Sequence, residues 1–356
     1  MRVPRTLAFL SITLAALAFS SATAQTERRT LSGDRVSIYN IAGRLRVQPG
    51  GGSTVVAEVT RSGRDANQLR VQAGDIRGIA TLRVIYPADR IVYPELGFRS
   101  NTELRVNEDG TFDDHGGGTG NWRDGDRVQI RGSGSGLEAH ADMVVSVPRG
   151  QRLTVHWGAG EATVSNVDGD LSISVSAARI TTEHTRGVLN LDTGSGSVSV
   201  IDAQGEVNLD TGSGSVTADG IRGNDLSMES GSGSMTVNNV DVKTLKAEVG
   251  SGGMRLGRVR ASVVRAEVGS GGIDVDMMSA VEELVVEGGS GGVTVRLPAT
   301  QGADVDIETG SGGIESDFAV QTTRFGRNHL RGQIGNGRGR IHIESGSGRV
   351  RLIKND

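Results

Sequence analysis

The sequence predicts an all-β fold, a single-stranded, β-helix-like β-solenoid with about 18–21 residues in each coil. Three observations support this prediction. Gly-Ser-Gly recurs at nearly constant spacing, short segments of alternating aliphatic and polar residues flank each copy, and glycine makes up 54 of 356 residues while proline makes up 6. Glycine that recurs at fixed intervals indicates a repeat architecture, because a disordered glycine-rich chain shows no such period.

The Gly-Ser-Gly motif sets the length of the repeat. Successive copies lie 18, 19, 19, 19, 20 and 21 residues apart, and we interpret the last interval, of 36 residues, as two coils of 18. A regular period of this length is typical of a solenoid. The first glycines of the copies are Gly194, Gly212, Gly231, Gly250, Gly269, Gly289, Gly310 and Gly346.

The segments beside each motif are predicted to be strands. Leu189-Asn190-Leu191 precedes the first copy and Val198-Ser199-Val200 follows it, and this alternation places the aliphatic residues on one face. A unit of two short strands cannot bury that face alone, so successive coils are expected to stack around a shared interior. Glycine in the turn supplies a positive φ or a close backbone approach that a Cβ would obstruct.

The first 24 residues predict export. Arg2 and Arg5 precede an apolar run, Leu7 to Phe19, and Ala22-Thr23-Ala24 fits a cleavage site, so residues 1–24 are interpreted as a signal peptide. The apolar run is too short to cross about 30 Å of hydrocarbon as a helix, and no membrane span is expected elsewhere. The mature chain is therefore predicted to be periplasmic, associated with the cell envelope, or secreted.

The mature chain divides into three parts that differ in their sequence pattern. Residues 25–84 alternate without Gly-Ser-Gly turns and are expected to form an N-terminal β cap with the first coils, whereas 141–356 carry the repetitive solenoid. Residues 85–140 lack the alternation of aliphatic and polar residues and are interpreted as an aromatic- and glycine-containing insertion. Its aromatic residues are the candidate contacts for a partner: Tyr86, Tyr93, Phe98, Phe112 and Trp122.

Composition excludes several classes of function. The chain has no cysteine, which removes disulfides and thiolate metal sites, and its net charge of −4 argues against a nucleic-acid partner. The repeated glycine motif lacks the Gly-Lys-Ser/Thr ending of a nucleotide loop, and a calcium-binding β-roll would need a recurrent aspartate that only Asp274 supplies. Asp113-Asp114-His115 is the one local cluster that suggests a metal, and a solvated loop explains it better. We therefore predict no catalytic, cofactor-binding or metal residues.

One column of acidic residues recurs two places before each motif. Stacking would align these carboxylates at rung spacing, where neighbouring charges about 4.8 Å apart repel by roughly 0.9 kcal/mol in bulk water. One interpretation is a solvated outer face, partly compensated by residues such as Lys246 and Arg265; the other is a linear acidic strip for divalent cations or a polycationic partner. The column comprises Asp192, Asp210, Glu229, Glu248, Glu267, Glu287, Glu308 and Glu344.

The chain resembles the DUF4097 family, whose members are also called candidate adhesins. The resemblance rests on Ile41-Ala42-Gly43-Arg44-Leu45-Arg46-Val47, on Val147-Pro148-Arg149-Gly150 and on the serial Thr-Gly-Ser-Gly turns, and it covers roughly 35–356. It implies a β-solenoid of bacterial envelope or secreted proteins, with no catalytic residues to carry over. The predicted function is accordingly a non-enzymatic, adhesin-like or scaffold protein that contacts an envelope or surface partner, protein or glycan. The alternative is a polysaccharide-active β-helix enzyme, a lyase or hydrolase.

Overall fold

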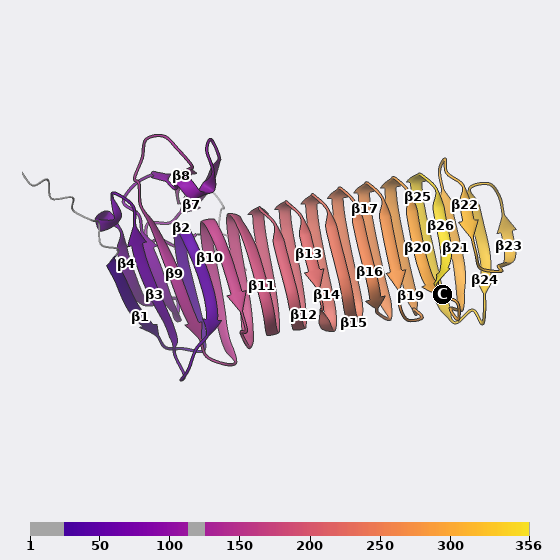
Figure 1. Ribbon diagram of the computed structural model, residues 1–356, viewed down its shortest axis with the longest axis horizontal. Helices are drawn as coiled ribbons and strands as arrows, with labels where there is room; N and C mark the ends of the chain where they lie inside the picture. Colours follow the sequence, from indigo (N-terminus) through magenta and orange to yellow (C-terminus); the bar gives the residue numbers. More distant parts are fainter. Residues whose placement is uncertain (1–24, 113–124, 356) are drawn as a thin grey trace, which may run out of the picture.

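The chain forms an elongated rod built almost entirely of β-strands (Figure 1), which confirms the predicted all-β solenoid. The computed structural model describes residues 25–112 and 125–355, so the predicted signal peptide lies outside the described residues. Two short 3-10 helices interrupt the strands, η1 (Ala66–Gln68) and η2 (Pro94–Leu96). No described helix has the length and hydropathy needed to span a membrane.

The strands fall into two groups along the chain. Those of the N-terminal end are β1 (Gln25–Leu31), β2 (Arg35–Pro49), β3 (Val55–Ser62), β4 (Arg70–Ile76), β5 (Ile79–Ile85), β6 (Arg90–Val92), β7 (Asn101–Val106), β8 (Asp126–Arg131) and β9 (His140–Val147). Those of the rod are β10 (Gln151–Ser165), β11 (Gly169–Ser195), β12 (Val198–Ser213), β13 (Val216–Asp219), β14 (Arg222–Ser232), β15 (Met235–Ser251), β16 (Met254–Arg260), β17 (Val263–Ser270), β18 (Ile273–Met277), β19 (Glu283–Ser290), β20 (Val293–Pro298), β21 (Ala303–Thr309), β22 (Ile314–Ser316), β23 (Gln321–Phe325), β24 (His329–Ile334), β25 (Gly339–Ser347) and β26 (Val350–Asn355).

Successive coils of the rod pair in parallel at the predicted period. Leu189 of β11 pairs with Val207 of β12, Val207 with Leu226 of β14, and Leu226 with Leu245 of β15. Each coil thus contributes one strand before its Gly-Ser-Gly turn and one strand after it. The strands after the turns form their own parallel ladder, for example through β13, β15, β16 and β18.

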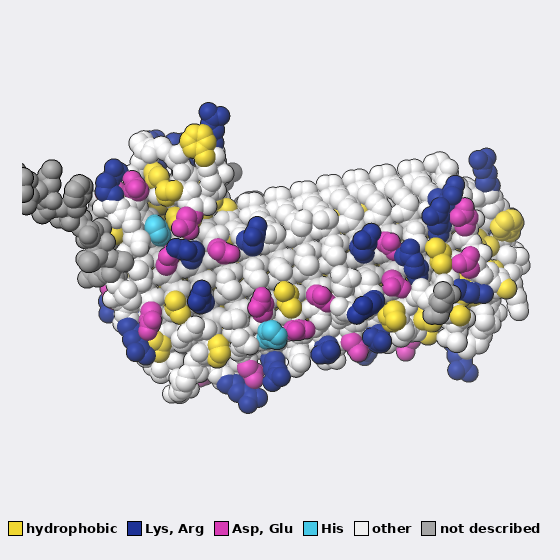
Figure 2. All heavy atoms as spheres, in the orientation of Figure 1, with side chains coloured by type: hydrophobic (Ala, Val, Ile, Leu, Met, Phe, Trp, Pro, Cys, Tyr) yellow, Lys and Arg dark blue, Asp and Glu magenta, His cyan; other side chains and the backbone are white. Residues whose placement is uncertain are grey.

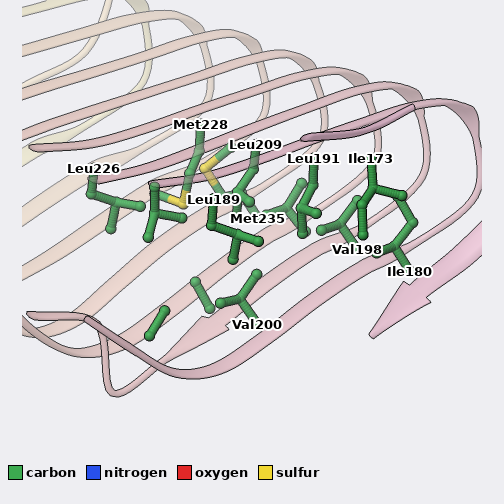
Figure 3. Close-up of a cluster of buried hydrophobic side chains, with 14 of the residues drawn as sticks. Ile173, Ile180, Leu189, Leu191, Val198, Val200, Leu209, Leu226, Met228 and Met235 are labelled. Atoms are coloured by element: carbon green, nitrogen blue, oxygen red, sulfur yellow. The ribbon is translucent and has the colours of Figure 1, made fainter. Parts of the chain in front are cut away.

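The core is the aliphatic interior of the coils. Figure 3 shows side chains from before and after the turns pointing into the same interior, among them Leu191, Val198 and Met228. These three side chains are 1–2% exposed, and polar neighbours alternate with them along each strand. Full burial of such a side chain stabilises the fold by roughly 1.5–3 kcal/mol, so each coil depends on its neighbours for this gain.

At the N-terminal end, antiparallel strands close the stack. β2 pairs in parallel with β10 on one side and with β5 and β9 on the other. Beyond these, β3 is antiparallel to both β9 and β1, and β4 is antiparallel to β5. The regular stack of parallel coils therefore ends at β2, and the antiparallel strands cover this end.

A small separate sheet of order β6-β8-β7 protrudes from the side of this end (Figure 1). It belongs to the stretch 85–140, and it lies against the coil of β10. Gly158 of β10 marks the contact, because a Cβ there would approach the side chains of Ile130 in β8 and Leu104 in β7. The aromatic stretch is thus folded onto the rod by a packed junction.

At the C-terminal end, the order of coils in space departs from their order in sequence. Leu284 of β19 pairs with Ile341 of β25, and Ile341 pairs on its other side with Val305 of β21. β26 lies likewise between β20 and β22. The final coil is therefore inserted between two coils that precede it in the chain. The expectation of two sequential coils of 18 residues between Gly310 and Gly346 is wrong.

The residues between those two motifs form a cap instead of a coil. β24 pairs antiparallel with β21, and β23 pairs antiparallel with β24, so this hairpin covers the outermost coil (Figure 1). The physical reason is that a solenoid end leaves a row of unpaired backbone groups. The hairpin satisfies that edge of β21, and β23 is a short strand of five exposed residues.

Candidate functional site

The Gly-Ser-Gly turns stack into a tight ridge along the rod. Gly252 has a φ of +136°, and a Cβ on it would collide with the carbonyl oxygen of Gly233 in the preceding coil. Both reasons for glycine that the sequence suggested therefore apply at this position. The residue before each motif is buried, and where it is Thr or Ser its hydroxyl also closes the turn: the Thr211 hydroxyl donates to the carbonyl of Gly196 at 3.2 Å.

The acidic residues predicted as a column do form one continuous ladder, which we call the acidic ladder. Asp192 pairs with Asp210, and the series continues in register through Glu229, Glu248 and Glu267. The ladder then passes from Glu287 to Glu344 and ends at Glu308, which follows the inserted order of the last coils. Apart from Glu248, which is half-buried, these carboxylates are exposed.

Neighbouring cationic side chains neutralise the negative charge of the acidic ladder at only a few positions. Lys246 Nζ lies 2.7 Å from Glu248 Oε1, and this hydrogen bond, with the negative charge of Glu248, raises the pKa of the lysine. Arg265 instead lies 3.4 Å from Glu283, outside the ladder, so the expected pairing of Arg265 with the column is not found. Glu308 contacts His329 at 2.9 Å. The ladder therefore remains largely a solvated row of like charges.

The aromatic residues of the insertion are mostly core residues. Tyr86, Tyr93 and Phe112 are 8%, 0% and 1% exposed, so their rings are not available to a partner, which corrects that expectation for these three. Phe98 is 77% exposed, with the Arg99 guanidinium 5.3 Å from its ring centroid. Trp122 lies outside the described residues.

The buried rings form the junction between the insertion and the rod. The Tyr86 hydroxyl donates to Asn40 Oδ1 at 2.9 Å, and Phe112 packs edge-on against Tyr39, which stacks on His156. Burial raises the pKa of Tyr86 well above its usual range. Tyr93 donates to Glu95 at 2.8 Å, and its burial raises its pKa in the same direction. These aromatics thus attach the insertion.

The structure also brings together a cluster that the sequence did not reveal. Asp306, Glu308 and His329 place one ligand-type atom each within 4.8 Å of one another. Asp306 and Glu308 come from β21 and His329 from β24, and only the antiparallel pairing of those strands joins them. Glu308 and His329 lie 21 positions apart and no local motif joins them, so no sequence signal marked the cluster. Asp113-Asp114-His115 lies outside the described residues.

Several shallow grooves lie on the described surface. One of about 730 Å³ at the C-terminal end is lined by residues of β21, β23, β24 and β25, including Asp306, Arg331 and His342. Another of about 520 Å³ separates Glu95 and Leu96 of the insertion from the first turns of the rod. Figure 2 shows charged side chains spread over the lower faces of the rod, while an upper strip is uncharged. The described residues thus present long faces with shallow grooves.

Comparison of the sequence with family models finds a match. The family model described as Toastrack DUF4097 matches residues 123–352, which is more than half of the chain. Among solved structures, the chain is similar to a candidate cell adhesion protein from Clostridium sporogenes, at 10% identity and a TM-score of 0.23, covering 93% of this chain and 100% of that one. No curated protein sequence matches the chain.

Proposed function

Because the chain belongs to the Toastrack DUF4097 family, we propose that it is an exported, non-enzymatic β-solenoid that serves as an adhesin-like interaction scaffold at the cell envelope. Residues 1–24 are the export signal in this proposal, and residues 25–356 carry the function. The partner is an extended envelope or surface molecule, protein or glycan.

One observation carries the proposal: chemically similar side chains recur in register along the rod. The acidic ladder repeats a carboxylate at successive rungs from Asp192 to Glu308. Single exposed ion pairs are weak, about 0–1 kcal/mol each, but many contacts to one extended partner act together. A partner with regularly spaced positive groups, or one bridged by divalent cations, fits such a row.

The first test measures binding of the purified chain to isolated envelope fractions by co-sedimentation. Neutralising four ladder residues, with Asp210→Asn, Glu229→Gln, Glu267→Gln and Glu287→Gln, should weaken binding and flatten its salt dependence. A matched control neutralises four exposed acids outside the ladder, Glu161, Glu183, Asp225 and Asp241. If both variants lose the same amount of binding, the overall negative charge of the chain and not the acidic ladder is responsible. If neither variant loses binding, the acidic ladder takes no part in the interaction.

A second test separates bridging cations from simple screening. If adjacent rungs share Ca²⁺, millimolar calcium should raise the unfolding temperature more than NaCl of equal ionic strength, because it binds the folded ladder. Glu248→Gln with Glu267→Gln should remove that difference. If the carboxylates are only solvated, the two salts should act alike.

The enzyme alternative is tested on the same preparation. A screen of envelope and capsule polysaccharides with the purified chain should release no shortened products if the rod is a scaffold. Turnover that depends on the folded chain would replace the proposal with a lyase or hydrolase.

A further inference from the structure

The strongest unexplained chemistry lies at the C-terminal cap, on the outer face of β21, β24 and β25. Asp306 of β21 has Arg331 of β24 as its register partner on one side and His342 of β25 on the other. Glu308 has His329 as its partner on β24. Acidic and imidazole side chains therefore meet where the hairpin joins the last coils.

The His329 ring is held in one orientation by two carboxylates. Its Nδ1 lies 2.9 Å from Glu308 Oε1, a hydrogen-bond distance, and its Nε2 faces Asp306 Oδ1 at 3.8 Å. The side chain is 16% exposed. A hydrogen bond from Nδ1–H to Glu308 leaves Nε2 as the nitrogen with a free lone pair.

The two atoms that face each other, Asp306 Oδ1 and His329 Nε2, lack hydrogen-bond partners among the described residues, and both are buried. Their separation of 3.8 Å exceeds the 2.7–3.2 Å of an ordinary hydrogen bond. Two ligand atoms about 2.0–2.2 Å from a tetrahedral zinc ion lie roughly 3.3–3.6 Å apart, so the observed separation needs only a small closure to hold such an ion. Unpaired buried polar atoms at that distance fit an ion between them.

We propose that His329 Nε2 and Asp306 Oδ1 bind a divalent transition metal ion of the zinc class. Glu308 acts from behind by accepting the Nδ1 proton, which fixes the tautomer and raises the basicity of the ligating nitrogen. Imidazole and carboxylate together suit zinc better than calcium, which prefers oxygen ligands alone. The chain has no cysteine to compete for the ion.

Further ligands are available at the open side. Asp306 and His342 both line the groove of about 730 Å³, so the open side of the site is accessible to water and faces a second imidazole across the groove. Arg331 Nε lies 4.0 Å from Asp306 Oδ2, the other carboxylate oxygen, and partly balances the charge there. Because the ligands come from β21 and β24, the ion would join the cap hairpin to the outermost coil.

The test is a titration of the purified chain, without an affinity tag, with ZnCl₂ by calorimetry and by thermal unfolding. One ion per chain should bind and raise the unfolding temperature, and EDTA should reverse the shift. His329→Gln and Asp306→Asn should abolish this binding, and Glu308→Gln should weaken it by about tenfold to a hundredfold.

His184→Gln is the matched control. His184 Nε2 lies 3.4 Å from Asp202 Oδ2, but its side chain is 59% exposed, so this second histidine–carboxylate pair is a surface contact. Zinc affinity should be unchanged in the control.

Cobalt absorption spectra of the unaltered chain give a second measurement that does not depend on variants folding. A d–d spectrum typical of bound cobalt, displaced by zinc, is expected. Absence of binding to the folded parent, or binding that survives in both His329→Gln and Asp306→Asn, would overturn the site and leave His329 as an ion-paired histidine. Either result leaves the envelope-binding test unaffected.

Discussion

The middle of the rod and its C-terminal end obey different rules of assembly. In the middle, segments adjacent in sequence are adjacent in space, as when Val207 of one coil pairs with Leu226 of the next. At the end, Leu284 pairs with Ile341, and the earlier segment of β21 is displaced outward. The same strand-turn-strand unit is used in both regions.

The difference teaches that the repeat determines the coil but not the order of stacking. The turn is local, because its glycines, and the Thr or Ser that precedes several of them, act within one or two rungs. Pairing is not local, since Glu287 meets a glutamate at its partner position whether the next coil is that of Glu308 or that of Glu344. The hairpin β23–β24 resolves the choice, because it pairs with β21 and so requires β21 to be outermost.

Engineered disulfides should distinguish sequential stacking of the last coils from the inserted order, because a cross-link either forms or does not. The chain has no cysteine, so Glu287→Cys with Glu344→Cys introduces a single pair at adjacent rungs, about 4.8 Å apart. Mild oxidation should cross-link this pair, as read by mass spectrometry of proteolytic fragments. Glu287→Cys with Glu308→Cys spans two rungs, beyond the roughly 7 Å limit, and should stay reduced. The reverse pattern would restore sequential stacking.

Within the middle, two neighbouring glycines should respond oppositely to alanine. Gly252→Ala places a Cβ against the Gly233 carbonyl at a φ that alanine avoids, and should lower the free energy of unfolding by about 2–4 kcal/mol. Gly253→Ala is the control, because its nearest contact is 3.9 Å away and no positive φ constrains it. It should be neutral or gain up to about 1 kcal/mol by restricting the unfolded chain. Chemical denaturation measures both, and equal losses would contradict the stacked-turn explanation.

The sequence was sufficient for the regular part of the fold. Alternation at Leu189-Asn190-Leu191 and the glycine period predicted the strands, the turns and the alignment of the acidic ladder, because each depends on residues within one coil or on strict repetition. The inserted coil was not predictable from spacing. The interval from Gly310 to Gly346 happens to equal two periods, but a hairpin occupies it.

Functional residues were harder to predict because burial and long-range pairing decide them. Tyr93 and Phe112 read as exposed contacts in a glycine-rich stretch, yet they are buried where the insertion meets the rod. His329 gave no signal, since its carboxylate partners lie on another strand. Such residues become visible only when the register of β21 and β24 is known.

A second corner of the middle coils separates the two reasons for glycine. At a corner between successive Gly-Ser-Gly turns, left-handed φ values occur at residues other than glycine, with the exception of Gly220 (φ 75°). Here the chain needs the angle but leaves room for a side chain. Asn and Asp tolerate this region better than longer residues do. The left-handed residues of this corner other than glycine are Asn166 (φ 57°), His184 (54°), Asp202 (52°), Asn239 (55°) and Arg258 (52°).

Arg258 is the member of that corner least suited to its backbone, and it gives the smallest predicted effect. Its side chain is exposed, so Arg258→Gly removes a left-handed penalty of about 1–2 kcal/mol. The added freedom of glycine in the unfolded chain offsets roughly 0.5–1 kcal/mol of this gain. A net rise of about 0.5–1 kcal/mol in the free energy of unfolding is expected.

Arg255→Gly is the matched control, since it removes the same exposed charge from the same strand, β16, at an extended residue. It should lower the free energy of unfolding by about 0.5–1 kcal/mol. Opposite signs in chemical denaturation would show that φ alone governs this corner, whereas a loss in both variants would mean that Arg258 makes a contribution greater than its strain.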